Sequence, residues 1–469
     1  MGERQADHRV IPPAPIAERL APVPDPLEAY ARVSHLPHPI FLDSAERGPR
    51  GRYSFVAADP VSVIQSRGDA GALGAVLDAL GGADATPLSG LPPFQGGAAG
   101  CIAYEWGSAL ERLPPLATDD LGIPDVLLGI YDWVIAWDHA EDAAWLVSRG
   151  LGGRDPARRL AAVRALLATA PPTAGRRPSR PAVQRPGTRE VPDLAPLPVR
   201  SSFDRAGYER AVERVRQYIL AGDVFQVNIS QRFEIAVTKP PLELYRALRR
   251  RHPASFAALM ETEAYAILSS SPERFVRSDG VRVETRPIKG TRPRGVTPDG
   301  DRALAAELVA SGKDRAENVM IVDLMRNDLY RVCRPGTVTV SELCVLESHP
   351  TVHHLVSTVE GVLAPGADAA ALLAAAFPGG SVTGAPKVRA MEIIAELEPT
   401  RRGAYCGSIG YLSVTGAADF SIAIRTAVVR DGIATVSAGG GITADSDPSA
   451  EYDETIAKAR GVLAALAAP

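Results

Sequence analysis

Carboxylate side chains occur in two pairs with helical spacing in the second half of the chain. Asp314 and Glu317 stand three residues apart and lead into an apolar stripe. Glu451 and Glu454 repeat that spacing, and Lys458 follows on the same predicted helical face. Carboxylates are rarely buried unless they are paired or bind a metal, and oxygen ligands suit Mg²⁺ better than zinc. The pattern fits a magnesium site, or two solvated faces with Lys458 as counter-ion.

A lysine and a glutamate form a second candidate pair. Only five of the 51 basic residues are lysines, and one of them, Lys289, lies close in sequence to Arg286, Arg292 and Arg294. Neighbouring cations lower the pKa of an amine and can make it nucleophilic, whereas arginine stays protonated. Glu273 follows a proline a short way upstream. The two residues could supply a nucleophile and an acid, and the alternative is a surface glutamate beside a structural lysine.

Three further segments could bind an anion. The glycine-rich segment 377–387 is predicted to lead into a helix with Pro386 as its first helical residue, and backbone N–H groups there favour a carboxylate or phosphate. It is not a Walker A loop. The glycines at 439–441 could approach a ligand with bare backbone. Arg425 is predicted on a strand whose small neighbours leave room for an acidic ligand, and a satisfied structural arginine is the alternative.

The elements that must position these residues are predicted helices over 203–221, 311–333 and 450–466, with Asp447 as the N-cap and Pro448 as the first residue of the last helix. A strand after the first helix alternates in character. Its apolar positions are Phe225, Val227, Ile229 and Phe233, and its polar positions are Gln226, Asn228, Ser230 and Arg232. Strand position favours solvent for the polar face, and a wet site is the alternative. Clear helices and strands without regular βαβ alternation favour an α+β fold with antiparallel sheets.

Composition limits the broad class of the protein. The chain has 469 residues and a net charge of −4, which excludes a nucleic-acid binder on charge alone. Four scattered cysteines, no apolar leader and no run of 18 apolar residues predict a cytoplasmic protein outside the membrane. The segment 171–200, with eight prolines and six arginines, is predicted to be a linker between an N-terminal part, 1–170, and a C-terminal part, 201–469.

The C-terminal part resembles the chorismate-utilising enzymes over nearly its whole length. The matching runs are AGDVFQVN (221–228), SPERF (271–275), PIKGT (287–291), MIVDLMRND (320–328), HLVS (354–357), TGAPKVR (383–389) and GGGI (439–442). The N-terminal part resembles the same family in RYSF (52–55) and in the glycines of 96–100. The resemblance implies an α+β fold, a β-sandwich of two interlaced antiparallel-sheet halves with outer helices and the site between the halves.

The resemblance also implies roles for individual residues and a Mg²⁺ cofactor. Glu317 and Glu454 match metal carboxylates, with Asp314 and Glu451 as supports. Glu273 matches the general acid, and His354 matches a histidine near the departing hydroxyl. The residues that match contacts to the substrate are Ser381, Tyr405, Arg425, Gly439, Gly441 and Lys458.

Two positions separate the reactions of this family. Isochorismate and salicylate synthases resemble this pattern but carry a water-activating lysine where Gln226 stands. Anthranilate synthases usually have alanine at position 289, whereas Lys289 resembles the branch of aminodeoxychorismate synthase component I. In that branch the lysine is expected to attack C2 of chorismate in a covalent adduct, and ammonia then enters at C4. The product, 4-amino-4-deoxychorismate, leads to para-aminobenzoate, for folate or a secondary metabolite.

The sequence leaves two alternatives to that reaction and implies a partner. The alternatives are anthranilate synthase component I, which aminates C2, and a catalytically silent ligand-binding homologue. No cysteine stands in a G-x-C-x-G context. Ammonia is therefore expected from a separate glutamine amidotransferase subunit.

Overall fold

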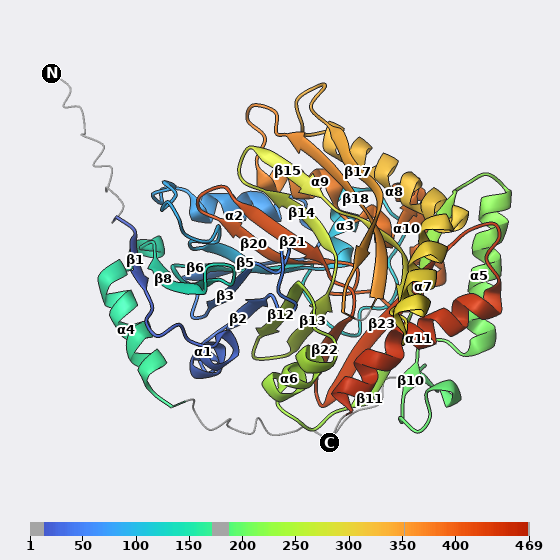
Figure 1. The fold of residues 1–469 in the computed structure, drawn as a ribbon, viewed down its shortest axis with the longest axis horizontal. Helices are drawn as coiled ribbons and strands as arrows, with labels where there is room; N and C mark the ends of the chain where they lie inside the picture. Colours follow the sequence, from blue (N-terminus) through green and yellow to red (C-terminus); the bar gives the residue numbers. More distant parts are fainter. Residues whose placement is uncertain (1–13, 171–186, 351, 468–469) are drawn as a thin grey trace.

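The computed structural model describes residues 14–170, 187–350 and 352–467, which form two large antiparallel sheets with helices around them (Figure 1). Both sheets contain strands from the N-terminal and the C-terminal parts of the chain. The predicted α+β fold of two interlaced halves is therefore confirmed. In the described ranges no helix is long and apolar enough to cross a membrane.

The first sheet has 13 strands. In spatial order they are β1 (Ile16–Arg19), β8 (Ala143–Ser148), β7 (Trp133–Asp138), β3 (Tyr53–Ala57), β2 (Ile40–Asp43), β12 (Phe256–Glu261), β13 (Ala266–Ser271), β22 (Thr426–Arg430), β23 (Ile433–Ile442), β11 (Gln226–Ala236), β10 (Arg200–Ser201) and β9 (Arg189–Glu190), with β19 (Gly384–Ala385) also paired to β11.

The second sheet has 10 strands. In spatial order they are β16 (Ile288–Pro293), β18 (Val352–Val362), β15 (Arg282–Thr285), β14 (Arg274–Ser278), β21 (Ala418–Ile422), β20 (Ser408–Ser413), β5 (Gly97–Ile102), β6 (Val126–Tyr131) and β4 (Ser62–Ser66), with β17 (Thr339–Ser348) also paired to β18.

The helices connect and cover these strands. They are α1 (Pro26–Val33), α2 (Ala72–Leu80), α3 (Gly107–Leu110), α4 (Pro156–Ala168), α5 (Arg205–Leu220), α6 (Pro241–Arg251), α7 (Pro298–Ala310), α8 (Gly312–Tyr330), α9 (Ala369–Ala376), α10 (Lys387–Leu397) and α11 (Pro448–Leu466), with short 3₁₀ helices η1 (Tyr104–Trp106), η2 (Leu151–Gly153), η3 (Pro192–Leu194) and η4 (Gly380–Val382).

The two predicted parts join through strand pairs rather than through a separate interface. In the first sheet β2 pairs with β12, and in the second sheet β5 pairs with β20. The β5–β20 joint depends on glycine, because a Cβ at Gly97 would lie 2.3 Å from the carbonyl oxygen of Leu412. Of the predicted linker, 171–186 lies outside the described residues. Its end, 187–200, supplies β9, η3 and the first residue of β10, so this stretch is part of the sheet edge.

The predicted N-cap of α11 is confirmed, and a serine that was not predicted as a cap stands at the start of α8. Ser311 caps α8 through a hydrogen bond from Asp314 N, and Asp447 caps α11 by accepting from Ala450 N at 2.8 Å, ahead of Pro448. A capping side chain satisfies one of the four free N–H groups at a helix start and typically stabilises the helix by about 1 kcal/mol. The caps fix where both acid-bearing helices begin.

The polar face of β11 differs from its prediction. Val227, Ile229 and Phe233 are fully buried as expected, but Phe225 precedes the strand and is 72% exposed. The polar positions are also buried, because helices and loops cover the second face of the strand. Gln226, Asn228, Ser230 and Arg232 are all less than 10% exposed, so the preference for solvent was wrong.

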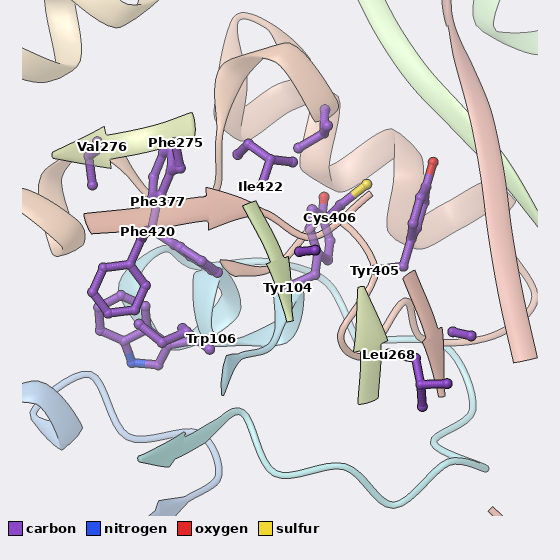
Figure 2. Packing of buried hydrophobic residues seen from close by; sticks show 14 of the residues in the cluster. Tyr104, Trp106, Leu268, Phe275, Val276, Phe377, Tyr405, Cys406, Phe420 and Ile422 are labelled. Carbon is purple, nitrogen blue, oxygen red and sulfur yellow. The ribbon is translucent and has the colours of Figure 1, made fainter. Parts of the chain in front are cut away.

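An aromatic cluster packs behind the glycine-rich loop (Figure 2). The ring of Phe377 lies 5.2 Å from that of Trp106 and 6.1 Å from that of Phe275, measured between centroids. All three side chains are buried. Such edge contacts add about 0.5–1.5 kcal/mol per pair to the burial of apolar area. Trp106 belongs to the N-terminal part, so this core holds the loop between the two parts of the chain.

Candidate functional site

The larger of two cavities in the described part of the chain has a volume of about 600 Å³. It lies between β11 and β23 of the first sheet and β16 and β18 of the second sheet. Helices α8 and α11 form its side. Every residue predicted for the site lines it. They are Glu273, Lys289, Asp314, Glu317, His354, Ser381, Tyr405, Arg425, Gly439, Gly441, Glu451, Glu454 and Lys458. The fold thus brings together residues that are up to 185 positions apart in the chain.

One wall of the cavity holds the predicted acid and the predicted nucleophile on either side of Ser381. The Ser381 hydroxyl donates to Glu273 Oε1 at 2.7 Å, and the Ser381 carbonyl accepts from Lys289 Nζ at 3.2 Å. Glu273 is 5% exposed, and burial raises the pKa of its carboxyl to about 7, against opposing effects of Ser381 and Lys289. A carboxyl with this pKa is protonated for part of the time near neutrality and can donate a proton.

The pKa of Lys289 is lowered, but not for the predicted reason. Burial lowers it, and the carboxylates of Glu317 and Glu273 oppose the shift. Each neighbouring arginine forms an ion pair with an acid. Arg292 pairs with Glu307 at 2.7 Å, Arg286 pairs with Glu347 on β17, and Arg294 pairs with Asp301 on α7. Desolvation disfavours the charged ammonium and so favours the free amine needed for attack. Lys458 adds a smaller lowering effect, but no neighbouring arginine does, so the prediction that these arginines depress the pKa of Lys289 was wrong.

The backbone around Lys289 bends where the strand meets α8. Gly290 follows with φ of +81° at a register shift between β16 and β18, and a Cβ there would lie 2.9–3.0 Å from side-chain atoms of Leu308 and Asp314. Glycine alone adopts that backbone conformation without steric cost. The bulge re-aims the chain beside the cavity and lets the strand approach α8 closely.

The acidic wall is formed by α8 and α11. Glu317 accepts from Gln226 Nε2 at 3.2 Å, and Glu451 accepts from Ser446 Oγ at 2.7 Å. Glu454 pairs with Lys458 Nζ at 2.7 Å, and this ammonium lowers the pKa of Glu454 although burial opposes it. Lys458 is thus the counter-ion of Glu454, as one reading of the sequence expected.

Asp314 is partly committed to another partner. Its carboxylate accepts from Arg292 Nη2 at 3.3 Å at the edge of the cavity. Within the described ranges, no three acidic, histidine or cysteine side chains form a compact group of metal ligands. The donor chemistry nevertheless fits Mg²⁺, because the carboxylates of Glu317, Glu451 and Glu454 line this side of the cavity, beside the ammonium groups of Lys313 and Lys458. A Cβ at Gly440 would lie 2.8 Å from Glu451 Oε2 and 3.9 Å from Glu454 Oε1.

Glycines on β23 allow the acidic helix and β11 to approach each other. A Cβ at Gly439 would meet the carbonyl oxygen of Ile229 at 2.4 Å, and one at Gly441 would meet Gln226 Nε2 at 2.3 Å. Any larger residue would push the strands or the cavity lining apart. Lys458 also donates to the Gly439 carbonyl at 2.8 Å. The glycines predicted to contact ligand are therefore also needed for the close packing of β23 against β11.

Arg425 occupies a tight connection rather than a strand. It lies between β21 and β22 with φ of +50°, a left-handed conformation that is uncommon for a residue with a side chain. Burial lowers the pKa of the guanidinium, yet it donates no hydrogen bond to any described residue. The predicted strand position was wrong. A partly buried guanidinium without a hydrogen-bond partner among the described residues is suited to bind a carboxylate.

His354 stands on β18 and is 3% exposed. Its Nδ1 lies 2.9 Å from the hydroxyl oxygen of Thr291 on β16. Burial lowers the pKa of the imidazole to about 3, with smaller effects of Arg425 and His349 in the same direction. The ring is therefore neutral over the physiological range and can donate or accept a hydrogen bond at the cavity.

The glycine-rich loop reaches the cavity in a different form from the one predicted. Ser381 lies in η4, and Pro386 is the N-cap of α10 rather than its first helical residue. The loop contributes the Ser381 hydroxyl and carbonyl described above. The start of α10 points elsewhere, because Lys387 Nζ bonds Asp328 at 2.7 Å and the Ala376 carbonyl at 2.6 Å.

Several cavity residues escaped the prediction. The cavity is also lined by Lys313, Thr291, Arg292 and Asn228. Three of the five lysines of the chain, Lys289, Lys313 and Lys458, therefore face the same cavity. The scarcity of lysine was the signal that could have found Lys313. Tyr405, also predicted, is 7% exposed.

A buried ion pair ties the walls together. Arg402 donates two hydrogen bonds to Glu398, at 2.9 and 2.7 Å, and one each to the carbonyls of Val382 and Asn228. Glu105 of the N-terminal part accepts from the backbone N–H of Arg402 at 2.8 Å. One guanidinium therefore connects β11 and η4 through four hydrogen bonds. Such a hydrogen-bonded buried pair positions its neighbours, whereas removing one partner is strongly destabilising.

The smaller cavity, about 200 Å³, lies between the N-terminal and the C-terminal parts and is lined by charged residues from both parts. Asp43 accepts from Arg249 Nε at 2.6 Å and from Tyr245 at 2.9 Å. Arg274 donates to Asp419 and Glu284. These residues form ion pairs of the fold.

The chain was compared with known proteins. The family model described as chorismate binding enzyme matches residues 38–464. Aminodeoxychorismate synthase component 1 of Salmonella typhimurium is 42% identical over 457 residues, covering 94% of this chain and 96% of that protein. Anthranilate synthase component 1 of Mycobacterium bovis is 41% identical over 500 residues, covering 99% and 94%.

A solved structure agrees with these relatives. The crystal structure of anthranilate synthase component I from Streptococcus pneumoniae superposes with a TM-score of 0.76 at 34% identity, covering 89% of this chain and 93% of that chain. The match over nearly the whole chain and the cavity lined by the family's motifs lead to one conclusion. This protein belongs to the chorismate-binding enzyme family. Overall identity does not separate amination at C4 from amination at C2, because the two kinds of relative differ by only one percentage point.

Proposed function

We propose that this protein is an aminodeoxychorismate synthase component I, which converts chorismate and ammonia to 4-amino-4-deoxychorismate. The observation that carries the proposal is the placement of Lys289 in the cavity wall, with its pKa lowered by burial and with Glu273 on the other side of Ser381. An amine stands here where anthranilate synthases usually have alanine. The 42% identity to aminodeoxychorismate synthase component 1 of Salmonella typhimurium supports the same reaction.

The proposed reaction has two substitutions. In the first, the free amine of Lys289 forms a bond to C2 while the C4–O bond breaks, and Glu273 gives its proton to the hydroxyl, which leaves as water. The lysine nitrogen then gives a proton to the Glu273 carboxylate, so the adduct becomes neutral and Glu273 is protonated again. In the second, ammonia forms a bond at C4 while the bond between C2 and Lys289 breaks, and a proton passes from the new amine to the lysine. The sum is chorismate plus ammonia giving the aminated product plus water.

The remaining residues of the cavity bind and orient chorismate, which carries two carboxylates. The unpaired guanidinium of Arg425 and the ammonium of Lys458 are cations on its walls. The neutral His354 is placed to hydrogen-bond the hydroxyl that departs. Glu317 and Glu454 would hold Mg²⁺, with Glu451 and Asp314 beside them. When bound, the ion neutralises the ring carboxylate and assists loss of the hydroxyl as a Lewis acid.

Ammonia is proposed to come from a separate glutamine amidotransferase subunit. A glutaminase needs a reactive cysteine, and all four cysteines of this chain are buried. Burial raises the pKa of Cys101 and of Cys406 to about 12, so neither is a thiolate near neutrality. The purified chain is expected to use ammonium salts and not glutamine. Glutamine-dependent turnover by the single chain would contradict this part of the proposal.

Product analysis tests the proposed reaction. The chain is incubated with chorismate, Mg²⁺ and an ammonium salt, and products are separated by chromatography and identified by mass and absorbance. The proposal expects 4-amino-4-deoxychorismate. Anthranilate as the main product would assign the chain to C2 amination, and no consumption of chorismate would assign it to the silent homologues.

A further inference from the structure

A loop of the N-terminal part reaches the hairpin that carries His354. Glu46 lies after β2, and its backbone N–H donates to the Ala254 carbonyl at 3.1 Å. Its carboxylate oxygen Oε1 lies 2.7 Å from Nδ1 of His349, in the turn between β17 and β18. The two residues are 303 positions apart, and each side chain is 21% exposed. The contact is therefore a partly buried link between the two parts of the chain (β17 and β18, Figure 1).

His349 in turn packs against the histidine of the cavity. The ring centroids of His349 and His354 are 5.5 Å apart, with the rings tilted by 60°. His354 is held on its other side by Thr291, at 2.9 Å from Nδ1. The imidazole of His354 thus lies between a hydroxyl and a second ring, and that second ring is held by Glu46.

A second ionic link fastens the same loop to the same hairpin. Arg50 pairs with Glu347 on β17, and Glu347 also accepts from Arg286 at 2.7 Å. Glu347 stands directly opposite His354 in the register of β17 and β18. The loop therefore holds the hairpin from the turn and from the strand beside His354.

We propose that Glu46 is a positioning residue of the catalytic cavity, which holds the His349 ring against His354 and so orients the His354 imidazole toward the substrate. This inference rests on the proposed chorismate reaction, in which His354 faces the departing hydroxyl. It adds a residue that contacts neither substrate nor metal, contributed by the part of the chain that supplies no lining residue to this cavity.

The chemistry of the contact explains why a carboxylate is suited to this role. A carboxylate oxygen only accepts, so Nδ1 of His349 must carry the hydrogen, and the tautomer and the ring angle are fixed together. Without Glu46 the His349 ring can rotate, and the support behind His354 is lost.

Three single variants test the inference by steady-state kinetics of chorismate consumption. Glu46→Ala is expected to lower kcat about tenfold, about 1.4 kcal/mol of transition-state stabilisation, while KM for chorismate changes less than twofold. Glu46→Gln is expected to retain at least half of kcat, because its amide oxygen still accepts from Nδ1. Arg47→Ala is the matched control, because Arg47 is the exposed neighbour in the same loop, and its kcat should equal that of the wild type.

A double variant separates positioning from a general loss of structure. If Glu46 acts through His349, then Glu46→Ala combined with His349→Ala should lose no more than either single variant. The His354 ring signals in a two-dimensional NMR spectrum without substrate, assigned with His354→Ala, should shift in Glu46→Ala and not in Arg47→Ala.

Defined results overturn the inference. They are a wild-type kcat in Glu46→Ala, additive losses in the double variant, a loss in Glu46→Gln equal to that in Glu46→Ala, or unmoved His354 signals. The kinetic assay follows consumption of chorismate and not formation of one product. If the enzyme forms anthranilate, the proposed amination at C4 is refuted, but the test of Glu46 remains valid. Because the NMR comparison needs no turnover, an inactive chain would refute the proposed function and still test the contact.

Discussion

The smaller and the larger cavity differ in how their charged side chains are paired within the part of the chain that the structure describes. In the smaller cavity Asp43 is held by Arg249 and Tyr245, and Arg274 is held by two acids. In the larger cavity Arg425 donates no hydrogen bond to a described residue, and Lys289 meets only a carbonyl oxygen in its hydrogen bonding. Charges that satisfy each other stabilise the fold, whereas buried charges left without partners are costly and are retained for a ligand.

The two walls of the larger cavity also differ in how their side chains are held. On one wall, Glu273 and Lys289 both form hydrogen bonds with Ser381, so this wall is already arranged for chemistry. On the opposite wall, Glu454 and Lys458 are half exposed and the carboxylates repel one another. Burial raises the pKa of Glu451, and the negative charge of Glu454 acts in the same direction.

The largest expected effect is on the acidic wall. Glu317→Gln and Glu454→Gln should each lower turnover at least about 10³-fold, because each removes a charged ligand of the proposed Mg²⁺ while stability changes little. Removing one member of a self-repelling cluster does not weaken the apo fold. Steady-state rates with Mg²⁺ measure turnover, and thermal melting in the presence of chelator measures the stability of the apo protein. Asp323→Asn, an exposed change on the same helix, is the control. Full activity in either variant, or in excess chelator, would remove the metal from the proposal.

The next largest effect concerns the nucleophile. Lys289→Arg keeps a positive charge but cannot attack C2, so kcat should fall at least about 10²-fold, roughly 2.7 kcal/mol. With ammonia withheld and Mg²⁺ present, intact-mass spectrometry of the wild type should show an adduct of chorismate minus water. Lys239→Arg is the matched control outside the cavity lining. Near-normal kinetics in Lys289→Arg together with no adduct would make Lys289 a substrate anchor.

A companion substitution addresses the choice of product. Lys289→Ala should leave C2 open to direct attack by ammonia and give weak formation of anthranilate. Chromatography of the products under the same ammonium conditions measures it. Formation of the C4 product by this variant would show that the covalent step is dispensable.

A smaller effect is expected with pH. Burial raises the pKa of Glu273 to about 7, so its proton-bearing form decreases as pH rises through that value. If Glu273 is the general acid, kcat/KM for chorismate, measured at constant free ammonia, should fall about tenfold per pH unit above 7. Glu273→Gln should abolish this descending limb along with most activity. A profile that stays flat from pH 7 to 9 would assign proton donation to another group.

The smallest effect on activity is expected in the smaller cavity. Asp43→Ala leaves the Arg249 guanidinium and the Tyr245 hydroxyl without their partner, which should lower the free energy of unfolding by about 3 kcal/mol. The rate per folded molecule should change less than twofold. Urea denaturation followed by fluorescence measures the loss, and adding Arg249→Leu should restore part of it. A large fall in kcat without a change in stability would show that this cavity also serves the reaction.

Much of the local structure could be predicted because its causes are local. Helices α8 and α11 begin where Ser311 and Asp447 can cap them, and their acids share a face because helical spacing places them there. The motifs also placed all the proposed site residues in one cavity correctly, since they occur in a fixed order along the chain. What each residue does in that cavity stays a prediction.

The errors arose where distant parts of the chain decide the environment. The polar face of β11 is buried because helices and loops from elsewhere cover it. Arg425 leaves the strand because two strands of different sheets must be joined in a tight connection. The arginines near Lys289 in sequence find acids on other elements, so their charges do not act on the amine as expected.

By itself, the sequence determined the family, the starts of the acid-bearing helices and the set of side chains that share the larger cavity, because capping, periodicity and motif order depend on neighbours in the chain. The tertiary structure alone decided which of those groups are buried, which find partners and which are left for a ligand. The lowered pKa of Lys289 is the clearest case, because desolvation by the folded protein causes it. The reach of Glu46 to His349 across 303 residues is another, because only the packed sheets bring the two together.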